Sequence, residues 1–544
     1  MPMTASQGFP TRIWPYRRPS AAGIALDQTA PPAALPPGLL YRFVMGFDPA
    51  PGREMSAPER AALRDPFATL LLLRGLFPLS LRALLAALDQ QNAVPDGLPE
   101  QLSFVVAEGG QIQWSPETAT LNRGFRFVVA RGRAGSFELF VSTGAPFDSE
   151  TQFLQVLAWD PVAGAFQYYE RRTGSWFWAG SSWDALAEPT RGRGPFDSHV
   201  NGAMVMKELE APWLHWDSMA QTIPPEALAP DDSLRSDPLF TGRTGAQELE
   251  RITRQGVDRW TDARLGRLIG ADDRVSGVVP LMRQVLTTTT VNIASARQTS
   301  AGSDDEPLFP PLELFLNRKA LLNLVLIEPD FAPPTVARGR YRRAAEALNL
   351  RLIDNFQEPP FVKSGDVFFA WAVPEPAFED LNVLDHLLRR GVLSRRFAAS
   401  LLMVDFTNPI GSRRRADLLR WVPEEADATG AGRIEARMSA AIDAALPGLP
   451  ADASERDLVA DLALPDTDWQ AAFAARIERF MAAVQAQLDS DDGLLELMRL
   501  ADSRRRAFRR RPLAEFDLSL PWTDIAPDAP FLRLDLEARV SPDL

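Results

Sequence analysis

Two of the three histidines in this 544-residue chain lie in one stretch, residues 190–218 (TRGRGPFDSHVNGAMVMKELEAPWLHWDS). They are His199 and His215, and the second opens a His-x-Asp triplet that ends at Asp217. Two imidazoles and a carboxylate on one side of an iron or other divalent metal ion leave positions open for substrate and oxygen. The sequence therefore offers His199, His215 and Asp217 as metal ligands. The usual order of such a motif is reversed here, because the lone histidine precedes the triplet.

The same stretch also suggests a non-covalent haem site. Trp213 and Trp216 lie close to His215 in the sequence, and Met204 and Met206 supply thioethers that can act as a second axial ligand. These four side chains are the residues we expect to contact a haem cofactor.

Two further interpretations of residues 190–218 stay open. A histidine can serve as a general acid or base near neutral pH, with Arg191 or Lys207 holding an anionic group of the substrate. In that case His199, His215, Lys207 and Arg191 form the catalytic set. The alternative assigns no chemistry to the stretch, which is then a packed connector whose histidines hydrogen-bond to the backbone.

Composition excludes several classes of protein. The chain has no cysteine, which excludes disulfides, thiolate nucleophiles, iron–sulfur clusters and covalent c-type haem. A net charge of −13 disfavours binding to nucleic acid, so we expect a small-molecule substrate and no nucleic-acid partner. Only three lysines accompany many arginines, alanines and prolines, a bias typical of a GC-rich bacterial genome. The oligomeric state is not indicated.

No segment predicts export or membrane insertion. The first twenty residues have no apolar run after their charges, unlike a secretory signal. The longest apolar run, residues 67–88, is interrupted by Arg74, Pro78 and Arg82, whereas a membrane span needs about 20 mostly apolar residues. We therefore expect a cytoplasmic protein without a membrane span.

Hydrophobic periodicity divides the chain into parts. Residues 1–37 lack periodicity and predict an extended or disordered arm; residues 38–100 predict a helical segment in which Ser56 caps a helix. From residue 102 the pattern alternates and predicts six antiparallel strands, over residues 102–108, 125–132, 136–143, 153–160, 165–172 and 175–180. Residues 101–221 then comprise this β unit and the histidine-containing connector.

Residues 237–544 predict a mainly helical domain with a few strands. Residues 244–269 and 378–390 have the spacing of amphipathic helices, and on the second of these His386 points away from the apolar face. Residues 367–373 are expected to form a strand. The arginines between 504 and 511 are expected to lie on a solvated face. The fold class is therefore α+β, with a β half followed by a mostly helical half.

A second hypothesis for function starts from aromatic density in the β unit. Aromatic side chains on a sheet can stack on sugars or flat ligands, although they are more often strand core. The residues concerned are Trp159, Tyr168, Tyr169, Trp176, Phe177, Trp178 and Trp183. The first hypothesis is a metal- or haem-assisted oxidoreductase acting through His199 and His215 at the junction of the two halves. The alternative is a non-catalytic ligand-binding or scaffold protein that uses this aromatic surface.

Overall fold

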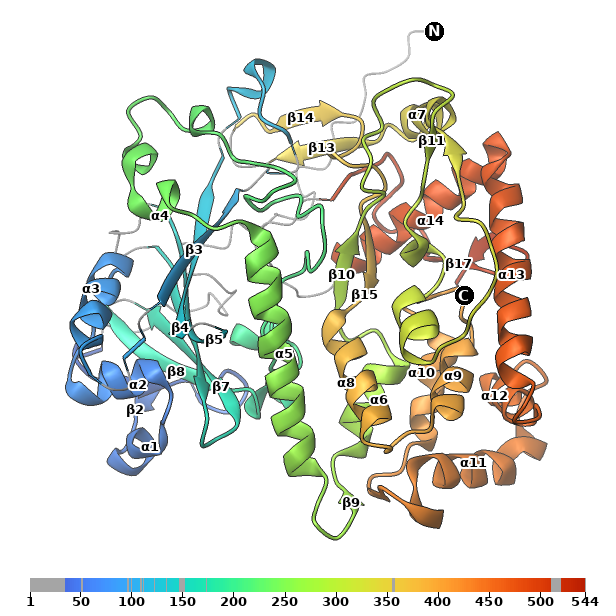
Figure 1. The fold of residues 1–544 in the computed structure, drawn as a ribbon, viewed down its shortest axis with the longest axis horizontal. Helices are drawn as coiled ribbons and strands as arrows, with labels where there is room; N and C mark the ends of the chain where they lie inside the picture. Colours follow the sequence, from blue (N-terminus) through green and yellow to red (C-terminus); the bar gives the residue numbers. More distant parts are fainter. Residues whose placement is uncertain are drawn as a thin grey trace, which may run out of the picture.

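The computed structural model places a β-sheet on one side of the molecule and a mostly helical part on the other, with the long helix α5 (Ala246–Leu268) between them (Figure 1). This arrangement confirms the α+β class. The structure describes residues 35–49, 52–94, 97–98, 100–107, 110, 112–121, 123–133, 135–145, 152–172, 174–354, 358–509 and 520–543. Residues 1–34 of the predicted arm lie outside that range.

The sheet has eight strands in the order β2-β1-β8-β7-β6-β5-β4-β3. They are β1 (Leu40–Arg42), β2 (Arg53–Glu54), β3 (Glu100–Ala107), β4 (Phe125–Arg133), β5 (Ser136–Gly144), β6 (Leu154–Asp160), β7 (Ala165–Arg172) and β8 (Ser175–Ser181). All six predicted strands are present, as β3 to β8, and successive ones pair antiparallel. The prediction of a purely antiparallel sheet of about six strands is wrong, because β1 pairs parallel with β8 and β2 extends the edge. Segments of two and three residues are too short to show alternation.

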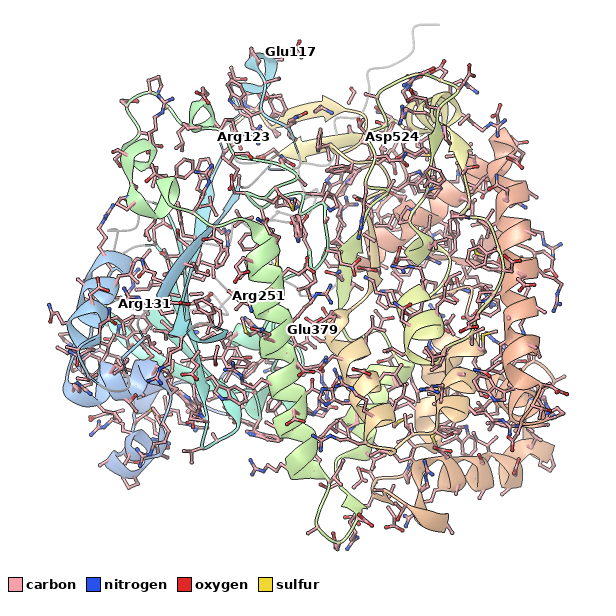
Figure 2. The ribbon with its side chains drawn as sticks, viewed as in Figure 1. Glu117, Arg123, Arg131, Arg251, Glu379 and Asp524 are labelled. Atoms are coloured by element: carbon pink, nitrogen blue, oxygen red, sulfur yellow. The ribbon has the colours of Figure 1, made fainter. Side chains whose placement is uncertain are left out.

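One face of the sheet is covered by the helices that lie between β2 and β3 in the chain. These are α1 (Ala57–Ala62), α2 (Pro66–Leu70) and α3 (Leu81–Gln91), with the 3-10 turn η1 (Leu72–Arg74). The predicted cap at Ser56 is confirmed, because its hydroxyl and the Glu59 carboxylate form a capping box at α1. The Tyr169 hydroxyl donates to Asp65 Oδ2 at 2.6 Å. Arg131, labelled in Figure 2 on the same side, pairs with Asp89 of α3.

Residues 190–218, called the connector below, tie the sheet to the helical half. Near the end of the connector, Ala107 of β3 donates its N–H to the His215 carbonyl at 3.0 Å, and the Asp217 N–H donates to Val105 at 3.0 Å. Earlier in the connector, the Lys207 carbonyl accepts from Ile293 of β10 (Val291–Ala294) at 2.9 Å. The connector therefore continues both the large sheet and a small one, and together with α5 it covers the second face of the large sheet.

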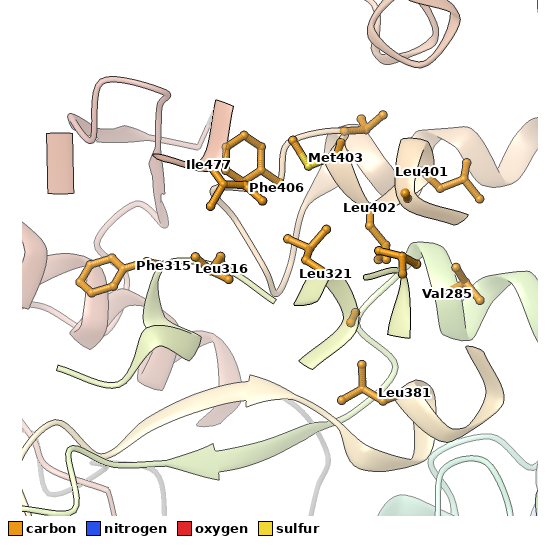
Figure 3. Packing of buried hydrophobic residues seen from close by; sticks show 14 of the residues in the cluster. Val285, Phe315, Leu316, Leu321, Leu381, Leu401, Leu402, Met403, Phe406 and Ile477 are labelled. Atoms are coloured by element: carbon orange, nitrogen blue, oxygen red, sulfur yellow. The ribbon is translucent and has the colours of Figure 1, made fainter. Parts of the chain in front are cut away.

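The helical half follows α5. Its α-helices are α6 (Val278–Leu286), α7 (Arg338–Ala347), α8 (Phe378–Arg389), α9 (Arg395–Met403), α10 (Arg413–Asp417), α11 (Ile434–Ala445), α12 (Ser454–Leu462), α13 (Trp469–Leu488) and α14 (Asp491–Arg509), while α4 (Pro238–Thr241) precedes α5. Two-stranded ladders join β10 to β15 (Val373–Pro376), β11 (Pro307–Leu308) to β12 (Val336–Ala337), β13 (Arg351–Asp354) to β14 (Phe361–Ser364), β9 (Arg274–Val275) to β16 (Ala426–Asp427), and β17 (Leu532–Leu534) to β18 (Val540–Pro542). Figure 3 shows part of its apolar core, where Leu402 of α9 packs near Leu321.

The strand predicted over residues 367–373 is wrong, apart from Val373, which begins β15. Trp371 takes a left-handed backbone conformation with φ of 59°, and its N–H donates to the Asp366 carboxylate at 3.0 Å. The Asp366 side chain thus takes the place of a neighbouring strand as the hydrogen-bond partner of this backbone. Alternation of apolar and polar residues does not reveal such a partner.

The expectation that His386 faces solvent is wrong. Its side chain is buried, with Nε2 at 2.8 Å from Asp258 Oδ1, because α8 packs against α5 on the side that the apolar stripe does not mark. Glu379, labelled in Figure 2 between α5 and α8, is also buried. Amphipathicity identifies one buried face of a helix, whereas α8 has two.

The expectation that the arginines between 504 and 511 lie on a solvated face is wrong for three of them. Arg504, Arg505 and Arg506 are buried. Arg504 donates to the Leu314 carbonyl, and Arg506 pairs with Asp502 at 2.8 Å. A carbonyl from a distant segment and a carboxylate one turn earlier on the same helix replace the water that the charge pattern implied.

Candidate functional site

A cavity of about 130 Å³ lies between strands β4–β7 and the layer formed by α5 and the connector. We call it the sheet cavity. Its lining comprises Arg126 and Val128 of β4; Phe140 and Ser142 of β5; Gln155, Val156 and Leu157 of β6; Tyr168, Tyr169 and Glu170 of β7; Leu249 and Thr253 of α5; Phe153; and Pro195, Ser198, His199, Met204, Val205 and Trp216 of the connector. The walls are mostly apolar, with a small number of polar groups, as in small-molecule sites.

Strand register places three polar residues in one row across the floor of the sheet cavity. Ser142 lies directly opposite Gln155, and Gln155 lies directly opposite Glu170. Side chains paired in this way have Cβ atoms about 4.5–5.5 Å apart on one face of the sheet. The row therefore presents a hydroxyl, an amide and a carboxylate side by side to the cavity.

Several polar atoms of the sheet cavity are buried without a hydrogen-bond partner among the described residues. They are Ser142 Oγ and Glu170 Oε1 on the sheet and Thr253 Oγ1 on α5. The other carboxylate oxygen of Glu170 accepts from Arg172 Nε at 2.9 Å. A buried polar group without a partner costs about 1–3 kcal/mol, and most such groups in native proteins are satisfied. Three such atoms on residues around one apolar cavity make it a candidate binding site for a molecule with polar groups.

His199 lines the sheet cavity in a defined tautomer. Its Nδ1 lies 2.7 Å from the Ala203 carbonyl, and since a carbonyl can only accept, Nδ1 carries the proton. Burial lowers the pKa of His199 to about 4, against the opposing effect of the Ala203 carbonyl, and the Lys207 charge lowers it further. The imidazole is therefore neutral near pH 7 and Nε2 is left as a hydrogen-bond acceptor. The Tyr168 ring packs edge-on at 5.1 Å between centroids and fixes its orientation.

Three of the proposed metal ligands, catalytic groups and haem contacts meet at the sheet cavity: His199, Met204 and Trp216. The other two proposed haem contacts lie elsewhere. Met206 is part of the apolar core beneath the sheet, and Trp213 donates its Nε1–H to Glu250 at 3.1 Å.

The remaining proposed metal ligands have separate partners. Glu208 accepts from the His215 N–H at 3.2 Å and lies 3.3 Å from His215 Nδ1. Asp217 pairs with Arg243 at 3.0 Å and accepts from the Ile223 N–H at 2.7 Å. Within the described part of the chain, no group of three or more His, Asp or Glu side chains is arranged to hold a metal ion. The geometry gives the metal-centre hypothesis no support.

The sheet cavity is also too small for haem. An engineered cavity of roughly 150 Å³ holds a single benzene ring, and a porphyrin contains four pyrrole rings. The cavity of about 130 Å³ fits a molecule about as large as one ring.

Lys207 and Arg191 lie outside the sheet cavity. Lys207 is buried, with Nζ at 2.7 Å from Thr290 Oγ1 and 3.7 Å from Glu379 Oε1. Arg191 pairs with Glu188 at 2.6 Å and lines a different cavity, described below. The structure therefore does not bring the four predicted catalytic residues together.

Sequence reasoning missed Ser142, Glu170 and Thr253. In the sequence, alternation over residues 136–143 sets Ser142 on the side opposite Phe137, Leu139 and Val141, and this signal could have found it. Alternation does not reveal that α5 and the connector cover this side of the sheet. It also does not reveal that Gln155 of β6 and Glu170 of β7 lie in register with Ser142.

Comparisons with protein-family models, with curated proteins and with solved structures found no match to this chain. Over the ranges that the structure describes, no helix is both long and apolar enough to cross a bilayer. The cytoplasmic location and the absence of a nucleic-acid partner stay predictions.

Proposed function

We propose that the protein binds a small molecule in the sheet cavity, with an apolar body about the size of one aromatic ring and at least one hydrogen-bond-donating group. The observation that carries this proposal is the set of three polar atoms, Ser142 Oγ, Glu170 Oε1 and Thr253 Oγ1, that are buried without partners on residues lining an apolar cavity. A ligand that bonds to them removes a desolvation cost that the empty fold bears.

The preference for a donor on the ligand follows from the chemistry of the walls. Glu170 Oε1 and His199 Nε2 can only accept, and the hydroxyls of Ser142 and Thr253 can accept as well as donate. A phenolic hydroxyl or an amine fits such a set better than a carboxylate does. Arg172 pairs with Oε2 of Glu170 and balances its charge, so the ligand group that donates to Oε1 can be neutral.

This proposal develops the ligand-binding alternative but moves the site. Trp176, Phe177 and Trp178 are buried, so the aromatic strands offer no exposed stacking surface there. Among the aromatics singled out, Tyr168 and Tyr169 line the sheet cavity. The oxidoreductase hypothesis lacks comparable support, because its histidines have separate partners and the cavity is too small for haem.

The test is ligand-observed NMR and calorimetry with phenol, benzylamine and benzoate as probes. Phenol or benzylamine is expected to bind saturably and more tightly than benzoate. Ser142→Leu, which fills the cavity and removes a hydroxyl, is expected to abolish binding. Ser136→Leu is the matched control, because Ser136 lies on the same strand but does not line the cavity. Failure of all three probes to bind, or equal binding by Ser142→Leu, would refute the proposal.

A further inference from the structure

A second cavity, of about 230 Å³, lies between the connector, α5 and α6. Its polar lining comes from Arg191 and Asn201 of the connector, Arg264 of α5, Arg283 of α6 and the threonines 287–289 that follow α6. We call it the arginine pocket. It is separate from the sheet cavity, although His199 lines one and its neighbours Val200 and Asn201 line the other.

Arg264 is the central group of the arginine pocket. Its side chain is 1% exposed, and one nitrogen, Nη1, donates to Gln284 Oε1. The other two, Nε and Nη2, are buried and have no hydrogen-bond partner among the described residues. Burial lowers the pKa of Arg264 to about 10, against the effect of nearby Asp380, so the group is cationic at neutral pH. A buried guanidinium edge with two unused donors matches two oxygens of one anion.

The other charges around the arginine pocket leave it positive. Glu188 lies 2.6 Å from Arg191 and 3.3 Å from Arg283, but its side chain is 69% exposed and can move aside. Asp380 does not line the pocket and accepts from Thr289 and Gln284 at 2.7 and 3.0 Å. Burial raises the pKa of Asp380 to about 7, so its negative charge is incomplete near neutral pH.

We propose that the arginine pocket binds the phosphate group of a small molecule. Arg264 supplies two parallel N–H donors from the buried end, and Arg191 and Arg283 supply charge at the open end, where Glu188 now pairs with them. Guanidinium forks suit phosphate because donors and oxygens match in spacing and number. This site goes beyond the function proposed for the sheet cavity, and either can fail without the other.

The experiment is isothermal calorimetry of the full chain with inorganic phosphate, glycerol phosphate and acetate, at constant ionic strength. Phosphate is expected to bind with one site per chain, and acetate at least tenfold more weakly. Tighter binding of glycerol phosphate than of inorganic phosphate would support a phosphate ester as the natural ligand, and equal affinity would support the free ion.

Variants separate the arginine pocket from general charge effects. Arg264→Met is expected to weaken phosphate binding at least tenfold. Arg283→Met is also expected to weaken phosphate binding, and because Arg283 is partly exposed this variant serves as the test if Arg264→Met does not fold. Arg251→Met is the matched control, because Arg251 lies on the same helix, is labelled in Figure 2, and pairs with Glu248 away from the pocket. Unsaturable binding, acetate binding as tight as phosphate, or an unchanged affinity in both pocket variants would overturn the proposal.

Discussion

Replacement of Thr253 by valine tests whether the sheet cavity contains unsatisfied polar atoms. Thr253 lies on α5, is 1% exposed, and its Oγ1 is buried with no partner in the described structure. Valine has nearly the same shape and puts a methyl group where the hydroxyl was. In most proteins the loss of a buried hydroxyl destabilises the fold, so the sign of the effect is diagnostic here.

The expected magnitude follows from two terms. Removal of a buried polar group that has no partner recovers its desolvation penalty of about 1–3 kcal/mol. Threonine and valine have similar helix propensities, so the helix itself contributes little. The free energy of unfolding of Thr253→Val should therefore rise by about 1–2 kcal/mol when no ligand is bound, while affinity for a phenol or amine probe falls.

The assay is urea denaturation monitored by fluorescence. The urea concentration at the midpoint of unfolding is compared between wild type and variant, provided that the dependence of the free energy on urea concentration is the same for both. Thr143→Val is the matched control. Thr143 is 2% exposed on the other face of the sheet, and its Oγ1 donates to the Phe153 carbonyl at 2.7 Å. The free energy of unfolding of this control should fall by about 1 kcal/mol or more, because the buried Phe153 carbonyl loses its donor. Destabilisation of Thr253→Val by as much as the control would refute the reasoning, since it would mean that the Thr253 hydroxyl is satisfied in solution.

Two further predictions concern the walls of the sheet cavity. His199 has a folded-state pKa of about 4, below its ordinary value of 6.5, so the unfolded chain takes up its proton first as pH falls. As pH falls from 6.5 to 4, His199 therefore lowers the free energy of unfolding of the wild type by roughly 3 kcal/mol. The free energy of unfolding of His199→Gln, measured by denaturation across that range, should depend correspondingly less on pH. Identical profiles for the two proteins would contradict this. In Gly256→Ala the new Cβ would lie 2.1 Å from Met204 Sδ, which should push the thioether into the cavity and weaken phenol binding at least several-fold by calorimetry. In Gly266→Ala, on the same helix, the new Cβ meets no heavy atom within 4 Å. The free energy of unfolding of this variant should rise by up to about 1 kcal/mol, and its affinity for phenol should be unchanged.

Local pattern predicted most of the secondary structure. Alternation identified all six strands from β3 to β8, and helical spacing identified α5 and α8. These signals depend on neighbours within a few residues, which is why they are visible without a structure. The same approach missed β1, since its three residues show no alternation and pair with β8, which lies more than a hundred residues away, and with the two-residue β2.

The connector shows where local reasoning stops. Its rare residues suggested one centre that contains both His199 and His215. Packing separates them, since His199 faces the sheet cavity beside Tyr168 while His215 is held by Glu208 against β3. Closeness in sequence does not determine closeness of side chains along an irregular segment that crosses between two sheets.

The amino-acid sequence alone establishes the α+β class, the six strands β3 to β8 and the absence of thiol chemistry. Tertiary structure alone decided which polar groups lose their water: His386 between two helices, Arg264 at the end of the arginine pocket, and Ser142 and Glu170 under α5. The reason is physical. Periodicity records which side of an element is apolar, whereas burial of a polar atom without a partner depends on segments that meet only when the chain has folded.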